Sequence, residues 1–194
     1  MALLRRIGYL LLLAMALTGA TKINEVDFKN FDYPWAEPRT AVPAAWKWLD
    51  GTPRSALRVK GGRHEFSPAE PFPDGYAMVQ SVTYGDINGD GRDEAAVDLL
   101  YSTGGTASWH YLYVFTLANG APTLLARLQS GSRADGGLLK VAINQNALIL
   151  DFADSDRRVG DCCSEGYVRI RYRWLSGRFV EVGKRVKGDN DAGR

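Results

Sequence analysis

The sequence predicts a mainly β protein, in which an antiparallel meander of about nine or ten strands forms a sandwich or a rolled sheet. Apolar and polar residues alternate with a period of two in several segments, as in half-buried strands. Turn residues separate these segments at short intervals, and most of the 21 glycines fall there. No segment has a convincing helical period, so we expect at most one short helix besides a signal peptide.

Residues 1–20 have the features of a secretory signal peptide. Arg5-Arg6 precede an apolar run, Ile7 to Leu17, which ends at the small residues Thr18-Gly19-Ala20. The run is too short to cross a bilayer core of about 30 Å comfortably, although a buried strand or helix is the alternative. We therefore expect a secreted or periplasmic protein with no stable membrane insertion once the signal is removed.

Charge and length limit the kind of partner. Removal of residues 1–20 lowers the number of basic residues from 24 to 22, against 22 acidic residues. A neutral chain argues against nucleic acid or an anionic membrane as the main partner. We expect residues 21–186 to form a single β-rich domain and the polar residues 187–194 to form a disordered tail.

The first half of the chain begins with an aromatic-rich arm at 22–38. Its aromatic residues favour packing in a core over a ligand-stacking surface. Residues 56–66 resemble a hairpin around Gly61-Gly62, and the proline-rich stretch 67–74 is expected to be a loop. Residues 76–84 then form a strand that leads into an acidic loop.

The second half contains the strongest strand signals. Residues 109–117 are apolar on both faces, which predicts a central strand, and Asn119-Gly120 predicts a tight hairpin to 123–128. A second hairpin is expected between 138–143 and 147–152. Residues 168–175 alternate, and their arginines are expected on a solvated face rather than on a surface that grips an anionic polymer. We predict that Trp174 pairs with Val180 across a three-residue loop.

The acidic loop between two predicted strands offers a calcium site. Asp86, Asn88 and Asp90 alternate before Gly91, and Glu94 follows. Oxygen side chains at this spacing can surround a cation that takes six to eight oxygen ligands. We expect calcium ligands from Asp86, Asn88, Asp90, the Arg92 carbonyl and Glu94. The alternative is a polar turn in which Asp and Asn cap their own backbone.

The pattern in YGDINGDGRDEAAV resembles the FG-GAP or VCBS calcium loop of integrin-type repeats. An EF-hand would need a bidentate Glu at position twelve of the loop, where this chain has Val97. In the FG-GAP family the acid at position nine is usually Asp; this chain has Glu94 there and an extra acid, Asp93, at position eight. A second copy of the pattern is absent from the sequence, so this chain alone cannot form a propeller of such repeats.

More broadly, the chain resembles small, uncharacterised secreted bacterial proteins with a single copy of this loop. The similar stretches include LLARLQSGSRADGG, the CC pair and YRWLSGRFVEVGK. This resemblance implies a fold and a compartment but no reaction.

The remaining reactive side chains suggest no catalytic site. Cys162 and Cys163 can form a vicinal disulfide, stay free or pair with another molecule. His110, on an apolar strand, favours packing over catalysis. The acids Asp151, Asp154 and Asp156 crowd one loop beside two arginines, which favours solvation over hydrolysis.

Two functional classes follow. The first is a non-enzymatic secreted domain with a structural calcium loop, which binds a protein partner or a glycan. The second is a calcium-dependent hydrolase that uses loop carboxylates.

Overall fold

A computed structural model describes residues 20–35, 46–49, 55–68 and 74–190 of this protein. It confirms the mainly β prediction: the described residues contain only two short 3₁₀ helices, η1 (Ile23–Glu25) and η2 (Ser155–Arg157). The predicted signal peptide lies almost entirely outside the described residues. Within them, no helix has the length and apolar character needed to span a bilayer.

The first sheet has six strands in the order β2-β8-β7-β6-β5-β4, and all its neighbours are antiparallel. Four of its strands are long: β5 (Tyr76–Gly85), β6 (Glu94–Ser102), β7 (Ser108–Ala118) and β8 (Ala121–Ser132). The two outer strands, β2 (Lys47–Trp48) and β4 (Arg63–Glu65), are short.

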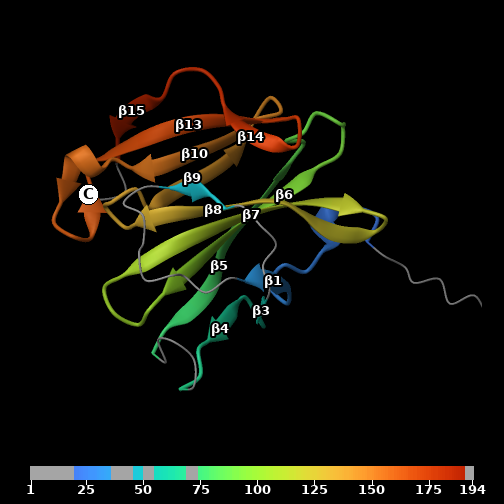
Figure 1. The fold of residues 1–194 in the computed structure, drawn as a ribbon, viewed down its shortest axis with the longest axis horizontal. Coiled ribbons are helices and arrows are strands. Elements are labelled where there is room, and N and C mark those ends of the chain that lie inside the picture. The colour runs from blue at the N-terminus through green and yellow to red at the C-terminus, as the bar shows by residue number, and fades with distance from the viewer. Residues whose placement is uncertain (1–19, 36–45, 50–54, 69–73, 191–194) are drawn as a thin grey trace, which may run out of the picture.

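The second sheet follows in the chain and packs on one face of the first (Figure 1). It contains β9 (Leu138–Ile143), β10 (Leu148–Ala153), β13 (Gly166–Leu175), β14 (Arg178–Glu181) and β15 (Val186–Asp189). β14 and β15 share one edge of β13, and a separate two-stranded hairpin of β11 (Arg158–Val159) and β12 (Cys163–Ser164) leads into it.

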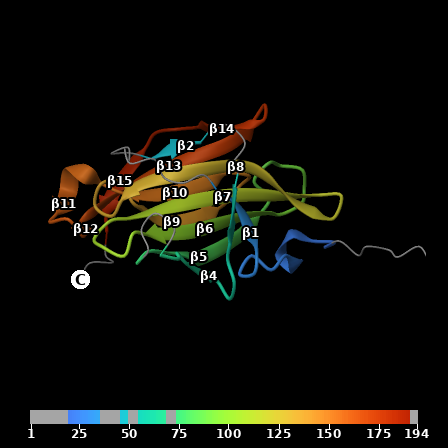
Figure 2. The same cartoon turned by 60° about the horizontal axis from the view of Figure 1, so that its bottom comes forward.

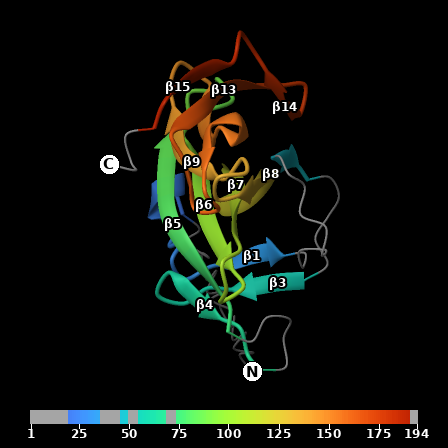
Figure 3. The ribbon, with the colours of Figure 1, turned by 90° about the vertical axis from the view of Figure 1, so that its left-hand side faces the viewer.

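Residues 22–35 of the aromatic-rich arm cover the opposite face of the first sheet and make a third layer. There β1 (Asp32–Trp35) pairs with β3 (Ser55–Arg58) below the sheet (Figure 3). Tyr33 and Trp35 are buried against aromatic side chains of β6 and β7, and the rings of Tyr33 and Tyr113 lie 5.1 Å apart. The preference for core packing of these aromatics is confirmed.

This three-layer arrangement explains why residues 109–117 are apolar on both faces. β7 pairs with β6 on one side and β8 on the other, as predicted for a central strand. Its odd-numbered residues, among them Tyr113, face the arm, while Leu112 and Val114 face the second sheet. Tyr113 is completely buried.

Two tight turns are confirmed and one register is wrong. Asn119 and Gly120 both have positive φ in the β7–β8 turn, and β9 and β10 form the second predicted hairpin. However, Trp174 pairs with Phe179, not with Val180. Ser176 adopts φ 51° and Gly177 φ 79°, so a two-residue turn closes the β13–β14 hairpin.

Three further expectations need correction. Nine or ten strands was too few, because pieces of two to four residues such as β2, β11 and β12 also pair. Residues 56–66 do turn at Gly61-Gly62, where Lys60 pairs with Arg63, but the strands on either side do not pair with each other, since β3 pairs with β1 and β4 pairs with β5. The predicted tail begins too early: β15 pairs with β13, and its Lys187 binds Asp154 and Asp156.

Candidate calcium loop and adjoining pocket

The predicted calcium loop connects β5 to β6 at one end of the first sheet. The chain reverses there through Gly89 and Gly91, whose φ values of 84° and 81° lie in the left-handed region that glycine enters without a steric penalty. β5 ends at Gly85, opposite Glu94 at the start of β6. The first and last side chains of the loop are therefore held near each other by the strand ladder.

The three alternating polar residues bind backbone N–H groups inside the loop. The Asp86 carboxylate accepts hydrogen bonds from Gly89 N at 2.6 Å and Gly91 N at 3.0 Å. Asn88 Oδ1 accepts from Asp90 N, and Asp90 Oδ1 accepts from Arg92 N. These contacts fix the loop by the self-capping expected of a polar turn.

Asp90 is also held in its ionised form. Burial alone would raise the pKa of Asp90, but the backbone N–H and the guanidinium of Arg92 outweigh that effect and lower the pKa. The Arg92 guanidinium lies 3.1 Å from Asp90 Oδ2 and is largely exposed. A charged carboxylate therefore stands at position five of the loop.

Glu94 is completely buried, and its carboxylate is hydrogen-bonded to the loop. Its carboxylate accepts hydrogen bonds from Ile87 N, Asn88 N, Asn88 Nδ2 and Thr116 Oγ1, at 2.9 to 3.2 Å. Burial raises the pKa of Glu94, and the N–H groups of Ile87 and Asn88 oppose that shift only in part. In this arrangement Glu94 anchors the loop to β7.

The donor set fits calcium at some positions better than at others. Asp86, Asn88 and Asp90 supply oxygen atoms, and a carboxylate that accepts two N–H groups keeps lone pairs for a cation. Glu94 already accepts four hydrogen bonds, which is about the capacity of a carboxylate. Across the described residues, no three His, Cys, Asp or Glu side chains form a ready metal site. Calcium would thus need Asn88 and backbone oxygen among its ligands.

Two residues that the loop pattern does not contain support it from a neighbouring strand and from a turn. Thr116 on β7 donates to Glu94, and Asn146 in the β9–β10 turn donates from Nδ2 to the Asp86 carbonyl at 3.1 Å. Both lie far from the loop in the sequence. Only the strand pairing and the packing of the second sheet bring them there.

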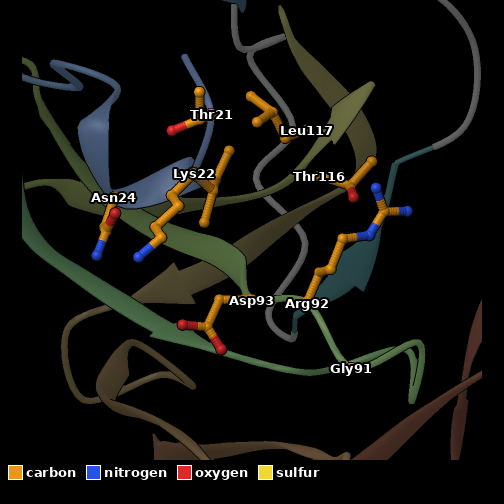
Figure 4. Close-up of a pocket in the computed structure, with 9 residues that line it drawn as sticks. Thr21, Lys22, Asn24, Gly91, Arg92, Asp93, Thr116 and Leu117 are labelled. Atoms are coloured by element: carbon orange, nitrogen blue, oxygen red, sulfur yellow. The ribbon is translucent and has the colours of Figure 1, made fainter. Parts of the chain in front are cut away.

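A pocket of about 350 Å³ adjoins the loop (Figure 4). The N-terminal segment provides Lys22 and Asn24 to it, the loop provides Arg92 and Asp93, and β7 provides Thr116. Asp93 therefore faces this pocket and takes no part in the hydrogen bonds within the loop. The lining mixes both charges with hydroxyl and amide groups.

No family model, curated protein or solved structure matches this chain. The function of the site has to be inferred from its own geometry.

The carboxylates considered for hydrolysis are held by basic partners. Asp151 binds Arg169, while Asp154 and Asp156 bind Lys187. The arginines of β13 alternate outward as predicted, opposite the buried Val168, Ile170 and Tyr172.

The two cysteines form a vicinal disulfide, one of the three alternatives that the sequence left open. The pair is exposed at the end of the β11–β12 hairpin.

Proposed function

We propose that this protein is a non-enzymatic, exported β domain in which the loop from Asp86 to Glu94 binds calcium and thereby fixes a surface that recognises a protein partner or a glycan. The supporting observation is the preorganised loop, in which Asp86, Asn88 and Asp90 are already oriented by backbone N–H groups. The resemblance to integrin-type calcium loops supports the same ion.

Calcium would be bound by the carboxylates of Asp86 and Asp90, Asn88 Oδ1 and the Arg92 carbonyl, with water completing the shell. Glu94 would hold the loop in place, or join the ligands after it exchanges a hydrogen bond for the ion. Calcium would supply positive charge that relieves the repulsion between acids in a short turn. An affinity of about 10⁻⁵–10⁻³ M is expected for such an extracellular site.

The adjoining pocket is the surface that calcium would stabilise. Its hydroxyl, amide and charged groups suit a polar, hydroxyl-rich ligand such as an oligosaccharide. Because Arg92 and Asp93 belong to both the loop and the pocket, ordering of the loop would also order one wall of the pocket. Binding of a glycan here should therefore weaken when a chelator removes calcium.

The test is a thermal melt of the protein in calcium and then in chelator. Calcium at 100 times its Kd should add about 2.7 kcal/mol, which raises the melting temperature by roughly 5–10 °C in a domain of this size. If the melting temperatures in chelator and in calcium are equal up to millimolar calcium, the loop is a polar turn that does not bind the ion.

Matched variants separate ion binding from loop folding. Asp86→Asn removes the charge and keeps one of the two oxygens that accept the N–H groups of Gly89 and Gly91, so it should abolish most of the gain while it preserves part of the loop's hydrogen bonding. Asp90→Ala should do the same. Asp93→Ala is the control, because Asp93 faces the pocket, and it should keep most of the gain.

A further inference from the structure

The vicinal disulfide and the turn GSRADGG at residues 131–137 meet at a second pocket, of about 240 Å³, with His110. This pocket lies at the other end of β6 and β7 from the calcium loop, because β6 starts at Glu94 and ends at Ser102, which pairs with Ser108. In Figure 2 the β11–β12 hairpin lies at the left end of the molecule and the β7–β8 turn at the right end.

Arg133 gives this pocket a positive charge. Its guanidinium has no acidic partner among the described residues, and no acidic side chain lines the pocket. Asp135, the nearest acid in the sequence, pairs with Arg158 at 3.1 Å. The lining therefore suits a ligand with an anionic group.

The turn that carries Arg133 is rigid. Arg133 has φ 46°, and Gly137 N donates to its carbonyl. A Cβ on Gly131 would lie 1.8 Å from the Asp135 carbonyl oxygen, so the backbone is closely packed there. A non-glycine residue in the left-handed region costs free energy and persists only where the surroundings hold it. The turn thus fixes the point from which the arginine reaches the pocket.

His110 adds a hydrogen-bond acceptor. Its Nδ1 lies 2.7 Å from Oδ1 of Asp98, which is largely buried. Because a carboxylate accepts, Nδ1 carries a proton, and in a singly protonated ring Nε2 is then the nitrogen with the free lone pair. Nε2 makes no hydrogen bond within the described part of the chain. The Asp98–His110 pair therefore offers an acceptor of fixed orientation.

The rest of the lining is mostly apolar. Leu138, Leu139 and Ala153 contribute to it together with Cys162 and Cys163. Leu139 is 45% exposed, although it is a large apolar side chain. An apolar group of a ligand would cover this wall and remove it from water.

We propose that this pocket binds the terminal residue of a ligand that carries a free carboxylate, an amide N–H and an apolar side chain. Arg133 would bind the carboxylate through two parallel hydrogen bonds, and His110 Nε2 would accept the amide N–H. The apolar side chain would pack on Leu139 and the disulfide. The pocket is smaller than the 300–1,000 Å³, roughly, of sites for drug-sized ligands, so it takes one residue. Such a residue is found in N-acylated amino acids and at the C-terminus of peptides.

The test is an NMR titration of the purified protein with N-acetyl-L-leucine. We expect shifts in the backbone resonances of Ser108, Arg133 and Cys163. N-acetyl-L-leucinamide lacks the charge and 4-methylpentanoate lacks the N–H, so each should bind about tenfold more weakly or worse, since one hydrogen bond to a charged or buried group is worth roughly that factor. Equal binding of the amide, or shifts confined to other residues, would overturn the proposal.

Variants test the two walls of the pocket separately. Arg133→Gln should weaken binding of N-acetyl-L-leucine about tenfold, whereas Arg178→Gln, at an exposed arginine in β14, should not. Leu139→Asp changes an exposed residue, so the fold should persist, and its charge should repel the acid more than the amide. Unchanged affinity in both Arg133→Gln and Leu139→Asp would also overturn the proposal.

A peptide that ends in leucine with a free carboxylate distinguishes the two sources of the ligand. Binding at least as tight as that of N-acetyl-L-leucine indicates a polypeptide C-terminus. Binding of the small acid alone indicates a free acylated amino acid. If neither the peptide nor N-acetyl-L-leucine binds, the proposed site is contradicted. None of these outcomes depends on calcium, so the calcium loop can fail its own test independently.

Discussion

Asp151 on β10 lies directly opposite Arg169 on β13, and the guanidinium donates two hydrogen bonds to the carboxylate, from Nε at 2.7 Å and from Nη2 at 2.8 Å. Asp151 is buried, while the side chain of Arg169 is 39% exposed. The pair raises the pKa of Arg169 chiefly through this hydrogen bonding, so the guanidinium stays charged.

A double-mutant cycle with Asp151→Ala and Arg169→Ala should therefore give a coupling free energy of about 1–2 kcal/mol in urea unfolding. Hydrogen bonds to charged groups contribute up to roughly 3 kcal/mol, and water around Arg169 reduces this. The matched control is the exposed pair Asp135–Arg158, which should give at most about 1 kcal/mol. Equal coupling in the two pairs would contradict the role assigned to burial.

Tyr113 is the second target. It is completely buried between Val97 and Arg127 of the neighbouring strands, and its hydroxyl donates to the Pro34 carbonyl at 3.1 Å. Tyr113→Ala should lower the free energy of unfolding by about 3–5 kcal/mol, as other large-to-small core changes do. Tyr113→Phe should lose only the hydrogen bond, about 1 kcal/mol.

Tyr84 is the control for that change, because it is 38% exposed. Tyr84→Ala should cost less than about 1 kcal/mol in the same denaturant titration. A small effect of Tyr113→Ala would mean that β7 is not the centre of the core.

Buried tyrosines should make the protein sensitive to alkali. Burial raises the pKa of Tyr172 to about 12 and raises the pKa values of Tyr33, Tyr111 and Tyr113 further. Since the unfolded pKa is about 10, the unfolded chain releases these protons first. Their contribution to stability is complete below pH of about 10 and is lost as pH rises towards the folded pKa values.

The measurement follows tyrosinate absorbance and circular dichroism together as pH rises. The buried tyrosines should ionise only as the sheet signal disappears, and Tyr172→Phe should reduce the loss of stability between pH 10 and 12, approximately. Ionisation of all tyrosines near pH 10 without loss of structure would refute this burial.

Thr116 tests the anchor of the calcium loop. Thr116→Val keeps the shape of the side chain but removes the hydrogen bond to the buried Glu94 carboxylate, so it should cost about 1–3 kcal/mol in chelator. Thr123→Val, on an exposed part of β8, should cost less than about 0.5 kcal/mol. The comparison requires only thermal melts, and equal effects would show that Glu94 does not depend on Thr116.

The periodicity of the sequence correctly predicted the features that are set by one strand and the turn next to it. The two apolar faces of β7, the Asn119-Gly120 turn and the alternation in β13 are all local in the sequence. The Trp174 register failed because Ser176 adopts a positive φ, a conformation that the sequence favours only weakly outside Gly and Asn. β15 was missed because its polar residues are held by pairing with β13, not by an apolar face.

For the candidate site, too, the sequence predicted the local features but not the contacts between distant residues. The order of Asp86, Asn88, Asp90 and Gly91 predicted the loop and its reversal. It could not indicate Thr116 or Asn146, which reach the loop from β7 and from the β9–β10 turn, and it could not show that four donors surround Glu94. The pocket beside the disulfide was beyond sequence reasoning, because His110, Arg133 and Cys163 come together only when the two sheets stack.

The short outer strands of the first sheet bear on self-association. An exposed sheet edge offers unpaired N–H and C=O groups to strands of other molecules. β4 covers the start of β5, and the β5–β6 pairing then shifts register between Val79 and Ser81. A bulge at such an edge bends the strand and disrupts a continuous ladder. The irregularity at Gln80 should therefore disfavour edge-to-edge pairing of this sheet at high concentration, and a variant that removes it should form fibres more readily.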